Sequence, residues 1–534
     1  MDPLVVLPTD VVELVFEHVD FEQRLVCSRV SRSWHAFILD HCHSLSIDMR
    51  HYYMEPEKYS ENLLLWLKRV KGVRHFTMRF YTQSFAPDLI DTIANARWSG
   101  LRSLSISASK GGAWLPTTDA QNVLAIVRDS LQLRKLTLSF ADVILTRQDM
   151  ITLLATAQCL THFEYRQIRG HPPRSTNADT QPPVQAVQCH ALTHLTWITS
   201  FHDFLYDLLP LCPNLETLTL SDSNSTTQSE LENMMSLILL KKLPRLHTFA
   251  IGEPRDHLLK KTSSDLADIP GLRHLTLVPE AMNMECQSYL SHIAAELFQA
   301  HQMTLLSFAV DISAANAYSF WTQITRQLTA PLLPLTYLSY NFHSREDQGT
   351  ALEVLFYRLL ERCPHLDTLN LWHVPWNDHQ LLRILSASDT LSRVKVQTTR
   401  LDRGPEADDW LDGVSYTLPA LTHLALHHHI SDSFYHHLNR LENLKTLAIS
   451  SQNWISPTTL TDFFRDKTPR LERVDLDGLY GAFNGKVAAA LAAIPSLHEV
   501  IIDDDASITE AELRVLYDHG KIIRQRLNTP LFPV

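Results

Sequence analysis

Cysteine is scarce in this sequence, and its few positions form no recognisable framework. Seven of the 534 residues are cysteines, they are widely dispersed, and none belongs to a Cys-x-x-Cys pair. An odd and scattered set predicts neither a disulfide framework nor a cysteine zinc site. The sequence therefore fits a reducing compartment best.

Basic charge and long apolar runs are also in short supply. Lys and Arg total 47 against 59 Asp and Glu, giving a formal net charge of -12, which disfavours a nucleic-acid or anionic-membrane binder and favours protein partners. No run approaches the roughly 20 apolar residues that span a bilayer, since Lys241 and Lys242 end the segment MMSLILL. The start Met-Asp-Pro, with Asp10 in the early apolar stretch, is unlike a signal peptide. We expect a location in the cytoplasm, the nucleus or both.

Familiar catalytic motifs are missing as well. The sequence contains no G-x-S-x-G, H-E-x-x-H, G-x-x-x-x-G-K-[ST] or G-x-G-x-x-G. Asp503, Asp504 and Asp505 follow a predicted strand without a partnering base, which favours a solvated acidic loop. We therefore predict no catalytic residue and no cofactor, although enzymes without these motifs exist.

Histidine, in contrast, is abundant, with 28 residues. Five of them cluster in LALHHHISDSFYHH, at His427, His428, His429, His436 and His437. A zinc site needs three or four converging ligands, whereas consecutive residues on a strand point to opposite faces. We therefore predict a polar strand end and an exposed helix face here, and no metal site.

One short pattern, apolar-x-x-apolar-x-apolar, fills almost the whole sequence. Seventeen copies start between Cys42 and Leu497, among them LRKLTL at Leu133 and LETLTL at Leu215. Their mean spacing of about 28 residues resembles that of the leucine-rich repeat. The alternation in the last four positions predicts a short strand with two apolar side chains on one face, and stacked strands make a parallel sheet.

Helical segments separate the predicted strands, as in QNVLAIVRDSL and HQLLRILSAS. Candidate N-cap residues precede several of these helices: Thr146, Asn377, Ser431, Ser456 and Thr509. No unit of this kind buries its faces alone, so each depends on its neighbours. Since the asparagine that many leucine-rich repeats carry after the motif is absent, we predict an irregular α/β solenoid, a curved parallel sheet lined by helices.

The first forty residues carry more apolar side chains than so short a segment can bury. The pattern Leu7, Pro8, Val11, Leu14 and Phe16, followed by VSRSW from Val30 to Trp34, resembles an F-box over about residues 3 to 42. Its helical periodicity, with Pro8 suited to a helix's first turn, predicts three helices. Asp20 and Gln23 are spaced like a capping box, and Trp34 and Phe37 share a face of the third helix. We therefore expect an F-box at residues 1–41 and a solenoid with a C-terminal cap at residues 42–534.

The resemblance to the F-box implies docking on a Skp-family adaptor, and through it on cullin and RING subunits. By matching position, it implies these docking residues: Leu7, Pro8, Val11, Leu14, Val30 and Trp34. Some of them must instead hold the three helices together, and the sequence does not separate the two roles. The alternative is that this segment is only a helical cap on the solenoid.

The outward positions of the predicted strands are candidates for binding a protein target. In the early repeats they are His75, Arg79, Lys135, His162, Arg166 and His194, and in the late ones Trp372, Asp475, Asp477 and Asp503. This surface runs from basic to acidic, which favours a charged partner, unless these positions are merely solvated. Tyr165, Trp197 and Tyr340 occupy inward positions and are predicted core.

Two insertions, at residues 170–188 and 401–413, are further binding candidates and are typical of mobile loops. Taken together, the features predict a non-catalytic substrate-recognition subunit of an SCF-type ubiquitin ligase. The alternative is a leucine-rich-repeat scaffold, free or adaptor-bound, with no role in ubiquitination.

Overall fold

The computed structural model describes most of the chain. The described residues are 3–19, 21–48, 63–80, 86–108, 118–140, 145–167, 188–198, 205–220, 232, 236, 238, 242–252, 270–278, 284–327, 333–342, 349–398, 415–427, 430–450, 455–478, 482–503 and 508–526. The chain divides into two compact units, Met1–Arg255 with Pro279–Cys286, and Asp256–Val278 with Gln287–Val534.

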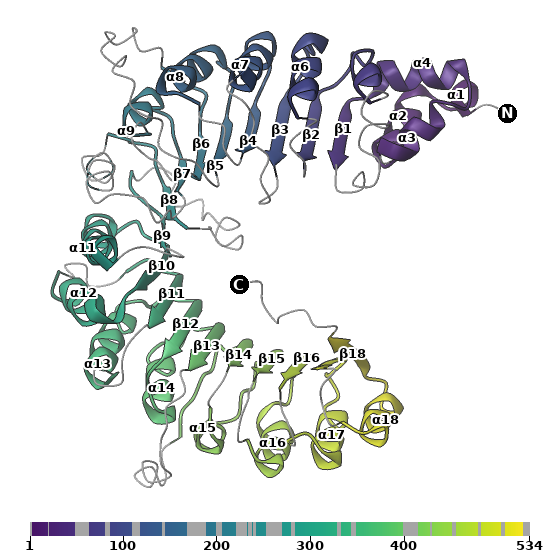
Figure 1. The fold of residues 1–534 in the computed structure, drawn as a ribbon. Coiled ribbons are helices and arrows are strands. Elements are labelled where there is room, and N and C mark those ends of the chain that lie inside the picture. The colour runs from purple at the N-terminus through teal and green to yellow at the C-terminus, as the bar shows by residue number, and fades with distance from the viewer. Residues whose placement is uncertain are drawn as a thin grey trace. The chain divides into compact units, whose positions relative to one another are not determined.

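The first unit contains a parallel sheet in which each strand pairs with the next along the chain (Figure 1). Its strands are β1 (Ser44–Asp48), β2 (His75–Phe80), β3 (Ser103–Ala108), β4 (Lys135–Phe140), β5 (His162–Gln167), β6 (His194–Ile198), β7 (Thr217–Leu220) and β8 (Thr248–Ile251). Equivalent repeat positions lie side by side, as Leu104 beside Leu136 and Leu136 beside Phe163. The apolar positions of the repeat therefore form continuous buried columns.

The second unit continues the same pattern, again with parallel pairing of consecutive strands. Its strands are β9 (His274–Leu277), β10 (Ser307–Ile312), β11 (Tyr337–Phe342), β12 (Thr368–Val374), β13 (Arg393–Thr398), β14 (His423–His427), β15 (Thr446–Ser450), β16 (Arg473–Asp477), β17 (Glu499–Asp503) and β18 (Ile522–Arg526). Each of the seventeen predicted motif copies forms a strand, β1 to β17, and β18 was not predicted. The α/β class predicted from the repeat is confirmed.

Helices connect the strands and lie along one side of them (Figure 1). In the first unit they are α6 (Ala86–Ala96), α7 (Thr118–Asp129), α8 (Arg147–Thr156) and α9 (Leu205–Leu208), the last followed by a 3-10 turn at Leu209–Leu211. In the second they are α11 (Met284–His301), α12 (Ala314–Gln327), α13 (Gly349–Leu360), α14 (Asp378–Leu385), α15 (Asp432–His437), α16 (Pro457–Asp462) with a π-helical turn at Phe463–Lys467, α17 (Gly485–Ala492) and α18 (Glu510–Asp518).

The predicted N-caps are confirmed at all five positions. Thr146, Asn377 and Thr509 form complete capping boxes, while Ser431 and Ser456 accept from backbone N–H groups of the first turn. These side chains satisfy donors that have no partner within the helix. These five helices therefore begin at the residues that the sequence indicates.

Aromatic side chains fill the core between strands and helices. The predicted core residues Tyr165, Trp197 and Tyr340 are all at most 1% exposed. In the second unit Trp321 meets both Tyr340 and Phe356 edge to face, at centroid distances of 4.8 and 5.2 Å. Burial of such side chains is the main stabilising term of a repeat that cannot fold alone.

Four helices precede the first strand: α1 (Pro3–Val6), α2 (Thr9–Glu17), α3 (Phe21–Cys27) and α4 (Arg32–His41). The three predicted helices are present, and the single turn α1 is additional. Pro8 is the N-cap of α2 and does not lie in its first turn, since the helix begins at Thr9. No helix within the described residues is long and apolar enough to cross a membrane.

Candidate functional site

The N-terminal helices expose an unusual amount of apolar surface. Leu7, Val11, Leu14 and Val30, all predicted docking residues, are between 40% and 65% exposed, and Pro8 is exposed too. Three aliphatic side chains that were not predicted add to this surface: Val6, Val15 and Val26. We call these seven aliphatic residues the N-terminal apolar face. Val15 follows Val11 at helical spacing, so the pattern contained the signal for it.

Helix α2 is apolar on two sides, which explains why one of them stays open. Val12 and Phe16 point into the helical segment and are 4% and 9% exposed, whereas Val11, Leu14 and Val15 face outward. A surface helix normally buries its apolar stripe against the core, whereas α2 leaves part of that stripe open. The outward side of α2 therefore has the character of an interface.

Trp34 differs from the other predicted docking residues because it packs inside the segment. Its ring meets Phe16 edge to face at a centroid distance of 5.6 Å, and Phe37 lies 5.8 Å from the Phe16 ring. The backbone N–H of Trp34 donates to Oγ of the N-cap Ser31 at 3.2 Å. The half-buried Trp34 holds α2 and α4 together, a distinction that the sequence left open.

The strand face of the first unit carries stacked histidines at the predicted outward position. His162 and His194 are register partners, and their rings stack at 4.2 Å with an interplanar angle of 9°. Burial lowers the pKa of His162, and the neighbouring His194 and Lys135 lower it further. Burial also lowers the pKa of His194, with Glu216 opposing and His247 adding to the effect. Near and below pH 6.5 this pair therefore carries less positive charge than two histidines with ordinary pKa values would.

The other early candidates lie open on the same face. His75, Arg79 and Lys135 are exposed. Arg166 is half-buried and forms an ion pair with Glu164 two residues before it on β5. The cationic character predicted for the early repeats is thus partly offset by a carboxylate from the same strand.

One late candidate is placed differently from the prediction. Asp475 faces outward in register but is only 7% exposed, since it lies between Ala448 and Ile501 on the flanking strands. The expectation of an open carboxylate at Asp475 is wrong. Nearby, Glu499 forms ion pairs with Arg473 at 3.5 Å and with Arg524 at 3.0 Å. These arginines offset the negative charge of one carboxylate at this end of the sheet.

The remaining late candidates are half-buried or lie outside the described side chains. Asp477 accepts a hydrogen bond from Ser450 Oγ at 3.0 Å. Trp372 has Lys395 Nζ over its ring, 3.9 Å from the centroid, a cation–π contact. The side chain of Asp503 lies outside the described residues, as do Asp20, His428, His429, Asp504 and Asp505 and both predicted binding loops, apart from Gln188.

Comparison with known proteins assigns the N-terminal helices. Residues 4–43 match the family model of the F-box domain. The chain carries an F-box. Its match spans α1 to α4 and ends just before β1, so the N-terminal apolar face belongs to the F-box.

Two solved structures are similar to the chain as a whole. One is a TLR13–ssRNA13 complex, with a TM-score of 0.42 and 13% identity over 86% of this chain, which spans 56% of that one. The other is a yeast Rad7–Elc1 complex, with a TM-score of 0.39 and 13% identity over 90% of this chain and 95% of that one. No curated protein matches the sequence.

A buried arginine joins the F-box to the first strand. Arg24 is 7% exposed, and its guanidinium donates to Val19 O at 2.8 Å, to Cys42 Sγ at 3.3 Å and to Ser44 O. Burial raises the pKa of the Cys42 thiol, and Arg24 opposes that rise. Sequence reasoning missed this residue because arginine is mostly exposed in proteins.

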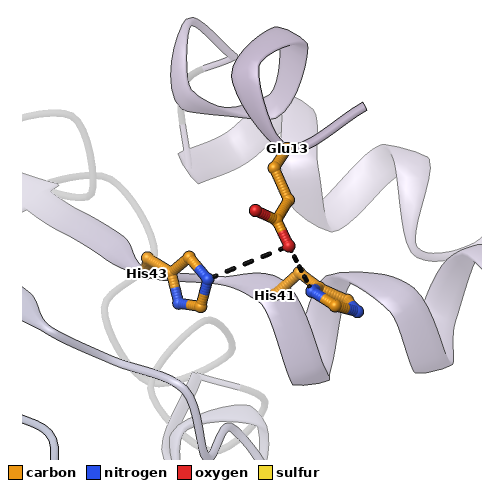
Figure 2. Close-up of side chains that lie close together, drawn as sticks. All are labelled: Glu13, His41 and His43. Carbon is orange, nitrogen blue, oxygen red and sulfur yellow. Dashed lines mark hydrogen bonds and ion pairs between the residues drawn. The ribbon is translucent and has the colours of Figure 1, made fainter. Parts of the chain in front are cut away.

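Within the described residues, one group of His, Cys and carboxylate side chains lies close enough to share a metal ion. It consists of Glu13, His41 and His43, at the same junction (Figure 2). The described histidines of the 427–437 cluster form no such group. His427 is 8% exposed at the end of β14, while His436 lies exposed on α15.

Proposed function

We propose that the F-box docks on a Skp-family adaptor through its N-terminal apolar face. The observation that supports this is that seven aliphatic side chains are exposed in one helical segment of 25 residues, from Val6 to Val30. Full burial of an exposed aliphatic side chain contributes about 1.5–3 kcal/mol, and these side chains, which are only 40% to 65% exposed, contribute correspondingly less before ordering costs. An adaptor that covers this face would remove the largest concentration of exposed aliphatic side chains among the described residues.

We further propose that the chain is the substrate-recognition subunit of an SCF-type ubiquitin ligase, with the F-box at residues 1–41 and the repeats, with a C-terminal cap, at residues 42–534. The repeats would hold a protein target through their strand face, for which His75, Arg79 and Lys135 are open candidates in the first unit. The chain would perform no chemistry itself. It would act by proximity, raising the effective concentration of target lysines near the charged ubiquitin-conjugating enzyme.

Capping and docking are compatible roles for the F-box. Its inner side is tied to the first repeat by Arg24, which reaches Ser44 O at the start of β1. Its outer side remains apolar and exposed. A pure cap would end in a polar outer surface, so the apolar outer side favours docking in addition to capping.

The experiment is co-purification of the full chain with a Skp-family adaptor. The variant carries Leu14→Glu and Val30→Glu, which place charge on two side chains that are 58% and 65% exposed. Leu131→Glu is the matched control, because Leu131 is 72% exposed outside the F-box. We expect the double variant to lose the adaptor and the control to retain it. Adaptor binding by both variants would refute docking through this face.

The alternative scaffold function is tested in cells. If the chain delivers targets, trapped ubiquitinated proteins are enriched with the unmodified chain and depleted with the Leu14→Glu, Val30→Glu variant. A scaffold that binds the adaptor without delivering targets would give the same ubiquitinated proteins with both.

A further inference from the structure

Glu13, His41 and His43 converge at the junction between the F-box and the first strand (Figure 2). Glu13 Oε1 lies 2.6 Å from His41 Nδ1 and 4.0 Å from His43 Nε2. The three side chains are 30%, 34% and 20% exposed, so solvent ions reach them. They come from α2, from the last turn of α4 and from the segment before β1.

A tight turn places both imidazoles on the carboxylate. Cys42, between them, has φ -79° and ψ 79°, and the N–H of His43 donates to His41 O at 3.0 Å. This is the geometry of an inverse γ-turn. The Phe37 ring stacks on His41 at 4.5 Å and orients it, while Cys42 is buried at 3% exposed.

A backbone carbonyl fixes the tautomer of His43. Its Nδ1 lies 2.9 Å from Gly72 O, and since a carbonyl only accepts, Nδ1 carries a hydrogen. In the neutral ring, Nε2 then presents a lone pair toward Glu13 Oε1. Two acceptors that face each other at 4.0 Å are stabilised by a cation between them. Metal-bound histidines usually show this arrangement, with the other ring nitrogen donating to a carbonyl or carboxylate.

Gly72 keeps that carbonyl in place through a close approach of two backbones. A Cβ at this position would lie 2.6 Å from Asp40 O. The loop before β2 therefore lies directly against the end of α4, where the N–H of Lys71 also donates to Leu39 O at 3.4 Å. The contact between this loop and α4 therefore fixes the position of the Gly72 carbonyl that supports His43.

The donor set selects the metal. Two imidazole nitrogens and one carboxylate oxygen suit Zn²⁺, whereas Ca²⁺ and Mg²⁺ require mostly oxygen ligands. Tetrahedral Zn²⁺ with bonds of about 2.0–2.2 Å separates its donors by about 3.4 Å, and the observed separations of 2.6 and 4.0 Å lie on either side of that value. All three donor atoms lie within 4.8 Å of one another, and three protein ligands on a tetrahedral ion leave its fourth position to water.

We propose that Glu13, His41 and His43 bind one Zn²⁺ ion that links α2 and α4 of the F-box to the first strand of the repeats. Without the ion, His41 Nδ1 lies at hydrogen-bond distance from Glu13 Oε1; to bind the ion through Nδ1, His41 carries its hydrogen on Nε2 instead. The Cys42 thiol is not counted as a ligand, because its sulfur accepts from the Arg24 guanidinium at 3.3 Å. The site would fix the orientation of the F-box relative to the first repeats, whether or not the chain serves a ligase.

The test uses the full chain, stripped of metal with a chelator and titrated with ZnCl₂ by calorimetry and thermal melting. Glu13→Gln with His43→Gln removes two ligands of the site. His436→Gln with His437→Gln is the control, which measures any weak binding of metal by histidines outside the site. We expect one high-affinity Zn²⁺ site and a rise in melting temperature in the unmodified chain and in the control. We expect a loss of at least ~10-fold in affinity in the site variant.

Cobalt supplies a second readout. Co²⁺ in the site is expected to give visible absorption of a four-coordinate ion, which the site variant loses. If the double variant fails to fold, His41→Gln alone, at the most exposed of the three ligands, serves the same purpose. The proposal is overturned if the unmodified chain binds Zn²⁺ no more tightly than the site variant, or if only the His436, His437 variant loses binding.

Discussion

His162 and His194 stack face to face on neighbouring strands, with ring centroids 4.2 Å apart. Two imidazolium ions do not stack favourably at this distance, so the arrangement favours the neutral rings. Burial is the first cause of both lowered pKa values; His194 and Lys135 add to it at His162, while at His194 Glu216 opposes it and His247 adds to it.

This pair predicts how stability depends on pH. Because both pKa values are lowered in the fold from the ordinary 6.5, the unfolded chain binds more protons in the window just below pH 6.5. Stability therefore rises with pH through that window and is fully present above it. We expect His194→Gln to flatten the melting temperature between pH 5.5 and 7.5, while His190→Gln, at an exposed site outside the strands, leaves the slope unchanged. An unaltered slope in His194→Gln would refute the assignment.

Gly72 predicts a sharp difference between two glycine substitutions. Gly72→Ala places a Cβ 2.6 Å from Asp40 O, whereas a Cβ on Gly100 meets nothing within 4 Å. We expect Gly72→Ala to lower the free energy of unfolding by about 1–3 kcal/mol and to speed proteolytic release of the F-box. Gly100→Ala is expected to be neutral or slightly stabilising. Equal behaviour of the two variants would show that the loop before β2 does not contact α4 closely.

Arg24 predicts that the same junction depends on one buried guanidinium. Arg24→Met removes the donors to Val19 O and Ser44 O and leaves the latter without this partner. Hydrogen bonds of a charged donor contribute about 1.5–3 kcal/mol each, so a loss of at least that size is expected in chemical denaturation. Arg29→Met, at an exposed position just after the end of α3, is the control. A change no larger than the control would place Arg24 outside the junction.

Thr509 predicts a local effect near the C-terminal end. Its side chain accepts from Glu512 N, and Glu512 Oε2 accepts from Thr509 N at 2.8 Å, completing the capping box of α18. Thr509→Ala is expected to cost about 1 kcal/mol and to increase hydrogen exchange in α18, while Thr509→Ser retains the cap. Protection of α18 that is equal in both variants would contradict this role.

The strands and helix caps depend on local periodicity and were predicted from the sequence. Contacts between residues that are far apart in the sequence were missed. Strands β1 to β17 follow from the alternation of the motif, and the caps from single residues. Strand β18 was missed because, in register with Leu497, Val500 and Ile502, it carries Gly520, Ile523 and Gln525, so two apolar positions of the motif are lost.

The sequence also did not predict how exposed a side chain is, or which residues distant in the sequence lie together. The pattern places Asp475 on the outward side but does not show that Ala448 and Ile501 leave it 7% exposed. Glu13 is 28 residues from His41; the packing of α2 on α4 brings these two together, and the turn at Cys42 adds His43. Neither feature has a signature in the spacing of residues.

Trp34 and Leu14 separate packing from docking within the F-box. Trp34 contacts Phe16 at 5.6 Å, so Trp34→Ala is expected to lower the free energy of unfolding of the F-box and to weaken adaptor binding as a consequence; because Trp34 is half-buried, the loss should be smaller than the roughly 3–5 kcal/mol typical of a fully buried tryptophan. Leu14 is 58% exposed, so Leu14→Ala is expected to leave melting unchanged. Its cost falls on the interface, where about 1.4 kcal/mol corresponds to a tenfold weaker Kd. Calorimetric titration with the adaptor and thermal melting of both variants check this. If Leu14→Ala lowers the melting temperature as much as Trp34→Ala does, Leu14 is part of the core and the apolar face is not an independent docking surface.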